Sequence, residues 1–121
     1  MFNREIYAEE TGGERKDCAV RAFSVAACVS YSTAQEIYQR HGRNPNKGTP
    51  FFVTERVMAT EFPDALFTTH NDITLPKFVR LYNKGHYLVH VRGHALAVVD
   101  GVIHDWRPRP KTKVRCAWRL V

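Results

Sequence analysis

The chain has 121 residues, of which 44% are hydrophobic and 25% charged, so we expect one globular domain over residues 1–121. Eighteen lysines and arginines against twelve acidic residues give a formal charge of +6, which suits an acidic partner or a solvated basic surface equally well. No apolar run reaches the roughly 18 residues of a membrane span, and no signal-peptide pattern opens the chain. We therefore expect a cytoplasmic protein with no membrane partner. The three cysteines have no paired short spacing, which argues against a disulfide framework and predicts reduced thiols.

The N-terminal part of the chain is predicted to hold a strand, a turn and one apolar helix. These elements are expected at residues 2–8, 11–14 and 19–29. Because only two residues of the helix are plainly polar, it should lie inside the fold. Asp17 is a suitable N-cap, which places Cys18 at the first helical position. Unpaired N–H groups and the helix dipole favour a thiolate there, so Cys18 is the first candidate nucleophile.

Three further helices are each marked by an N-cap signal followed by recurring apolar positions. They are expected at residues 33–41 after Ser32, 50–61 after Thr49, and 75–82 after Thr74. The apolar face of the helix over 50–61 is predicted to consist of Phe51, Val53, Val57, Met58 and Phe62.

The strands are concentrated in the C-terminal part of the chain. Residues 65–69 predict a short strand, and residues 86–106 alternate well enough for a three-stranded meander with turns at 92–93 and 100–101. Residues 114–120 add a last strand. Helices followed by an antiparallel sheet define an α+β fold, in which a buried N-terminal helix and a helical half pack on a C-terminal β-meander.

The turn at 100–101 fixes the pairing of the strands on either side of it. Leu96 then faces Asp105, and His94 becomes a diagonal neighbour of Asp105. Since side chains alternate along a strand, His94, Leu96 and Asp105 should share one face. We expect that face to cover the helix that begins with Cys18.

Three motifs in this order resemble the papain-like cysteine proteins. They are Asp-Cys-Ala-Val-Arg-Ala at 17–22, Gly-His-Ala-Leu-Ala-Val-Val-Asp-Gly at 93–101, and His-Asp-Trp at 104–106. The nearest likeness is to bacteriocin-processing peptidases and cell-wall amidases, and it covers most of residues 14–106. The chain also resembles small bacteriophage proteins, which would place it in the cytoplasm of the host.

The resemblance implies a papain-like fold and a hydrolase that cleaves an amide (peptide) or thioester bond of a peptide or protein substrate. By this likeness Cys18 is the nucleophile, His94 the general base and Asp105 the residue that orients the imidazole. No cofactor is implied.

The oxyanion site is where the chain departs from the papain pattern. A glutamine about six residues before the cysteine is absent, and Gly12 or Gly13 stands in its place. The backbone N–H of Cys18 can provide one donor, and Asn3 or Thr11 is a candidate for the second.

Histidines at 86, 90 and 94 also raise the question of a metal site. On the predicted strands His86 and His90 point away from His94, so no metal site is expected. His90 should share a solvated face with His104.

The remaining candidate residues allow alternative functions. Arg43 and Lys47 precede a helix start and can hold an anionic group of a partner. The basic run at 107–115 can contact nucleic acid, although ordinary solubility explains it better. The alternatives to an enzyme are a catalytically silent papain-like binding module and a basic phage protein that binds nucleic acid or a host protein. Cys28 and Cys116 lie in apolar stretches and are expected to pack in the core.

Overall fold

The structure is a computed structural model that describes residues 16–45, 47–105 and 112–121. Its elements are α2 (Cys18–Ala26), α3 (Tyr31–Arg40), α4 (Phe51–Glu61), β1 (Leu66–Thr74), α5 (Leu75–Leu81), β2 (His86–Val91), β3 (His94–Val99), β4 (Val102–His104) and β5 (Lys113–Arg119). The α+β class is therefore confirmed. The strand expected at 2–8 and the turn at 11–14 lie outside the described residues.

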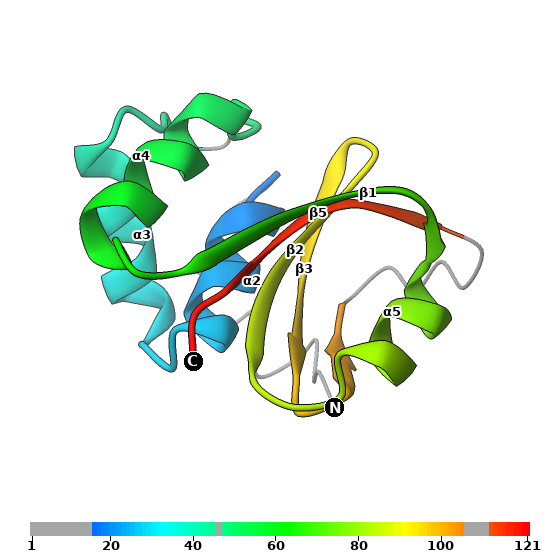
Figure 1. Ribbon diagram of the computed structural model, residues 1–121. Helices are drawn as coiled ribbons and strands as arrows, with labels where there is room; N and C mark the ends of the chain where they lie inside the picture. The colour runs from blue at the N-terminus through cyan, green and yellow to red at the C-terminus, as the bar shows by residue number, and fades with distance from the viewer. Residues whose placement is uncertain (1–15, 46, 106–111) are drawn as a thin grey trace.

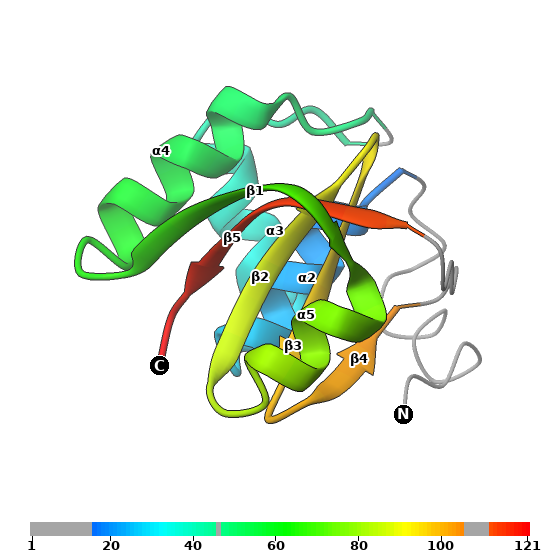
Figure 2. The ribbon, with the colours of Figure 1, turned by 45° about the vertical axis from the view of Figure 1, so that its right-hand side comes forward.

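The strands form one antiparallel sheet with the order β1-β5-β2-β3-β4. Helices α2, α3 and α4 gather on one side of the sheet, and the short α5 lies on the other (Figure 1 and Figure 2). Helix α2 packs directly on β3 and β2 and carries α3 on its outer side. No helix in the described part of the chain is long and apolar enough to cross a bilayer.

Both predicted hairpins of the meander are present. Val91 pairs with His94 across the first turn, and Val99 pairs with Val102 across the second. In the second turn Asp100 and Gly101 have φ angles of 47° and 80°, as a two-residue turn with left-handed central residues requires. The register extends beyond the last residue of β4 toward Asp105.

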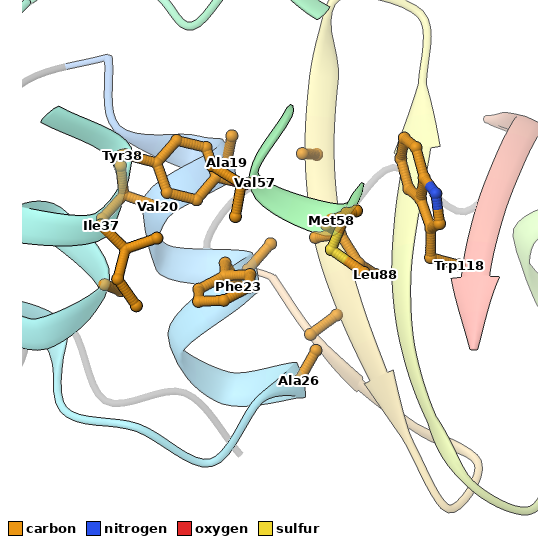
Figure 3. Packing of buried hydrophobic residues seen from close by; sticks show 14 of the residues in the cluster. Ala19, Val20, Phe23, Ala26, Ile37, Tyr38, Val57, Met58, Leu88 and Trp118 are labelled. Atoms are coloured by element: carbon orange, nitrogen blue, oxygen red, sulfur yellow. The ribbon is translucent and has the colours of Figure 1, made fainter. Parts of the chain in front are cut away.

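The sheet face that covers α2 differs from the expected one. Leu88 (Figure 3), Ala95 and Ala97 pack into the core around α2. Leu96 and Val98 pack with α5 on the opposite face. The prediction that the face of Leu96 covers α2 is wrong. Because β3 is covered by a helix on each side, both sets of its side chains are apolar, and alternation alone does not identify the face.

Several helix boundaries also differ from the sequence prediction. Helix α2 ends at Ala26, because Cys28 has a left-handed φ of 58°. The N–H of Val29 then donates a hydrogen bond of 3.0 Å to the carbonyl of Ser24. This hydrogen bond closes a Schellman motif, which usually has glycine at the left-handed position. Helix α3 is capped by the Ser30 side chain rather than by Ser32.

Helix α4 begins one residue later than expected, with Pro50 at the N-cap position in place of Thr49. Its buried residues are Val53, Thr54, Val57 and Met58. Phe51 was expected on this face but is 42% exposed, since it stands at the first turn and beyond the core. The cap of α5 by Thr74 is confirmed by a hydrogen bond from the Lys77 N–H.

A buried carboxylate fixes the start of α2. Asp17 occupies the N-cap position, as expected, with Cys18 as the first helical residue, but its side chain makes no cap hydrogen bond. One carboxylate oxygen pairs instead with Arg21 Nε at 2.8 Å, and the other accepts a hydrogen bond of 2.7 Å from the Tyr31 hydroxyl. The carboxylate is thus satisfied at 1% exposure, and it ties α2 to the first turn of α3.

The Asp17 contact yields a stability prediction. Tyr31→Phe removes a hydrogen bond to a buried charge and should lower the free energy of unfolding by about 1–3 kcal/mol. Tyr82→Phe is the matched control, since the Tyr82 hydroxyl has no hydrogen bond with the described residues. Urea titrations of both variants measure the difference, and equal stability of the two would contradict the assigned contact.

Candidate active site

The first residue of α2 is Cys18, and its side chain is half-buried. Backbone N–H groups in the first turn of a helix have no intrahelical acceptor, so they are available to a negative charge placed there. The neighbouring carboxylate of Asp17 is directed toward Arg21 and Tyr31. Its charge is therefore compensated locally and does not oppose a thiolate at Cys18.

The imidazole of His94 and the carboxylate of Asp105 form a shielded ion pair. His94 is the first residue of β3, and Asp105 directly follows β4. His94 Nε2 lies 2.8 Å from Asp105 Oδ1, and the two side chains are 8% and 2% exposed. The contact predicted from the hairpin register is therefore present.

The thiol of Cys18 makes a hydrogen bond with the His94 side chain. Because Nε2 of that ring is already bonded to Asp105, the nitrogen that faces the sulfur is Nδ1. The backbone N–H of Ala95 also donates to the sulfur. The structure thus brings Cys18, His94 and Asp105 together in a line, although most of the sheet face that carries His94 packs on α5.

The net effect of these contacts is to lower the pKa of the Cys18 thiol. Burial alone would raise it, but the hydrogen bond from His94, the N–H of Ala95, the charge of the imidazolium and the N–H of Ala19 together outweigh burial. The Ala19 contribution is the expected effect of a helix start.

The pKa of His94 is raised to about 9. Burial alone would lower it, and the hydrogen bonds to Asp105 and Cys18 together with the charges of those two groups overcome the burial. The lowered pKa of the Cys18 thiol and the raised pKa of the His94 imidazole both favour the thiolate–imidazolium pair over the neutral pair. The two groups are coupled, so they titrate as a pair rather than independently.

The proposed anion-binding residues Arg43 and Lys47 do not form a common surface. Arg43 is 2% exposed and donates its backbone N–H to the carbonyl of Tyr38, whereas Lys47 is exposed. Burial raises the pKa of the Tyr38 hydroxyl, the charge of Cys18 acts in the same direction, and Thr54 and Arg43 oppose them. Arg43 is therefore an interior residue whose charge acts on the buried Tyr38, and not part of a solvated loop.

Only one of the three expected oxyanion donors belongs to the described residues. Cys18, at the first position of α2, has a backbone N–H without an intrahelical acceptor. Asn3 and Thr11 lie outside the part of the chain that the structure describes. The second donor stays a prediction.

A second cysteine–histidine pair stands at the other end of α2. Cys28 was expected in the core, but it is exposed, and its sulfur lies 3.5 Å from Nδ1 of His86. That nitrogen also lies 3.0 Å from the carbonyl of Ala26, so it acts as a donor. This pair has no carboxylate partner among the described residues and sits at the negative end of the helix dipole. Cys116 is buried in the core as expected.

His90 was expected on a solvated face with His104, and that prediction is wrong. Its ring contacts Phe51 and Trp118 edge to face, with centroid distances of 5.1 and 5.6 Å. The prediction failed because Phe51 comes from α4, far away in the sequence. In residues 16–45, 47–105 and 112–121, no group of three or more His, Cys, Asp or Glu side chains is placed to hold a metal ion.

Comparison with known proteins does not assign the chain to a family. No family model matches the chain, no curated protein matches its sequence, and no solved structure matches its fold. A function is therefore argued from the contacts of Cys18, His94 and Asp105.

We predict that the thiols of the two cysteine–histidine pairs, Cys18 and Cys28, differ in reactivity. At pH 6 iodoacetamide should modify Cys18 at least about tenfold faster than the more exposed Cys28, since an ordinary thiol is almost fully protonated there. Peptide mapping of partly alkylated protein measures both rates. Equal rates at Cys18 and Cys28 would show that His94 and the helix start do not activate the thiol.

Proposed function

We propose that the chain is a papain-like cysteine hydrolase that cleaves an amide or thioester bond. The observation that supports the proposal most directly is the line from Cys18 through His94 to Asp105. It combines a thiol at a helix start, an imidazole bonded to that thiol, and a shielded carboxylate on the far nitrogen of the ring. The order Cys, His, Asp along the chain agrees with the resemblance stated for the sequence.

In the first half of the reaction the Cys18 thiolate attacks the carbonyl carbon of the substrate, and a carbon–sulfur bond forms. Nδ1–H of His94 then donates its proton to the leaving nitrogen or sulfur as the scissile bond breaks. The N–H of Cys18 is placed to stabilise negative charge on the carbonyl oxygen during this step. The product is an acyl group on the Cys18 sulfur.

In the second half His94 is neutral and accepts a proton from water, whose oxygen attacks the acyl carbon. The carbon–sulfur bond breaks, the acid leaves, and the thiolate–imidazolium pair is restored. Throughout both halves Asp105 accepts the Nε2–H hydrogen bond, which keeps Nδ1 directed at the sulfur and stabilises the imidazolium.

A generic acyl donor tests the proposal without knowledge of the natural substrate. With 4-nitrophenyl acetate, the protein should release a burst of 4-nitrophenolate and gain one acetyl group, found on Cys18 by peptide mapping. Cys18→Ala should abolish the burst, and Cys28→Ser should leave it unchanged. Acetylation spread over several cysteines and lysines would instead favour a catalytically silent binding module.

Asp105→Asn should lower the steady-state rate of ester hydrolysis by about 10²-fold or more, because the imidazole loses its preferred tautomer. Asp100→Asn is the matched control, since within residues 16–45, 47–105 and 112–121 the Asp100 carboxylate accepts a hydrogen bond from the N–H of Gly85, which an asparagine oxygen can also accept. A normal rate in Asp105→Asn would assign the orienting role to another group.

The pH–rate profiles of the unchanged protein and of Asp105→Asn should differ in their alkaline limb. For a peptide amide, whose leaving nitrogen takes a proton from the His94 imidazolium, the rate of acylation should fall as pH rises through about 9, where that ring loses its proton. Without the Asp105 carboxylate the imidazolium is less stable, and this alkaline limb should move to lower pH. An alkaline limb at the same pH in both proteins would mean that the Asp105 carboxylate does not raise the pKa of His94.

A further inference from the structure

Four rings form a continuous cluster beside the candidate active site, and we name it the aromatic row. Its members are Phe51 of α4, Phe67 of β1, His90 of β2 and Trp118 of β5. Phe51 and Trp118 are stacked at 5.6 Å with an interplanar angle of 29°, and Phe67 lies 4.7 Å from Trp118. His90 touches both Phe51 and Trp118 edge to face.

The row begins next to the reacting sulfur. His90 pairs directly with Ala95 across β2 and β3, and Ala95 is the residue whose N–H contacts the Cys18 thiol. From Ala95 the row crosses three neighbouring strands, because Trp118 is on β5 and Phe67 is its register partner on β1. Three strand spacings are about 15 Å, the length of about four residues of extended peptide.

Two rings of the row, Phe51 and Phe67, are open to solvent, whereas Trp118 and His90 are largely covered. Phe51 and Phe67 are 42% and 48% exposed, whereas Trp118 between them is 7% exposed. Rings of this size are usually covered, and neighbouring exposed rings on a rigid support are typical of binding surfaces. Trp118 and the sheet supply that rigid support (Figure 3).

The row carries no charge near neutral pH. Burial and, to a smaller extent, the positive charge of His94 lower the pKa of His90 to about 4, so its ring is neutral. Its Nε2 is buried and has no hydrogen-bond partner among the described residues. The guanidinium of Arg56 lies 5.1 Å above the ring of Phe52. Phe52 is not part of the row and makes no ring contact with its four members. A charged side chain would therefore find no partner on the row.

We propose that the aromatic row binds an aromatic or large aliphatic side chain of the polypeptide that Cys18 attacks, within about four residues of the scissile bond. This inference rests on the proposed function. It names the substrate class as peptides with apolar side chains near the cleavage point, rather than peptides with small or acidic side chains there. Phe51 and Phe67 act as specificity-determining residues, and neither takes part in the chemistry.

Peptide chloromethyl ketones test this preference, because the thiolate displaces chloride and forms a stable carbon–sulfur bond. Three probes share one scaffold: acetyl-Phe-Phe-Ala, acetyl-Ala-Ala-Ala and acetyl-Asp-Asp-Ala chloromethyl ketone. Relative to iodoacetamide, the phenylalanine probe should alkylate Cys18 at least about tenfold faster than the alanine probe, since apolar side chains gain by leaving water. The aspartate probe should be no faster than the alanine probe.

Three variants locate the effect. Phe51→Ala and Phe67→Ala should each reduce the preference for the phenylalanine probe, while Phe52→Ala should retain it. Phe52 is the matched control because it is 53% exposed and adjacent on the same helix. An unchanged iodoacetamide rate shows that each variant is folded at the site. Equal rates for all probes in the unchanged protein, or an equal loss in Phe52→Ala, would overturn the inference.

Binding without chemistry separates this inference from the proposed function. In Cys18→Ala combined with Trp106→Phe, Trp118 is the remaining tryptophan, so its fluorescence should change on titration with acetyl-Phe-Phe-Ala-amide and not with acetyl-Ala-Ala-Ala-amide. A fluorescence change together with an unreactive Cys18 would refute the hydrolase and support the row. A reactive Cys18 without a fluorescence change or probe preference would refute the row alone.

Discussion

The burial of the Asp17 carboxylate is the interaction on which the site depends. An ionised carboxylate at 1% exposure is tolerated only where its oxygens are paired, and Arg21 and Tyr31 supply that pairing from two different helices. These contacts hold the residue that precedes α2, and the helix begins directly after it at Cys18. At this first helical position the Cys18 sulfur contacts the His94 side chain and the N–H of Ala95.

The parts of the site that could be predicted are those set by local rules. The turn at Asp100 and Gly101 has the residues that a left-handed two-residue turn needs, and it fixes the β3–β4 register and with it the contact of His94 with Asp105. Cys18 could be placed at a helix start because the apolar run begins directly after it. Both inferences need only short stretches of chain.

The parts that could not be predicted depend on packing between distant segments. Strand β3 has apolar residues on both faces, so its sequence does not tell α2 from α5 as the covering element. The end of α2 was not predicted because Cys28 has the left-handed backbone conformation that is usually found at glycine. The surroundings of His90 were missed since Phe51, Phe67 and Trp118 come from three other elements.

Helix α2 shows why a cysteine beside a histidine is not sufficient for reactivity. Both ends of this helix carry such a pair, and the exposed Cys28 is the more accessible thiol. At the C-terminal end the dipole disfavours a thiolate, and His86 donates its Nδ1–H to a backbone carbonyl rather than being oriented by a carboxylate. At the N-terminal end the dipole, the Ala95 N–H and the carboxylate of Asp105 all favour the same charge distribution. Reactivity here is thus a property of the three elements that meet at Cys18, and not of the residue pair alone.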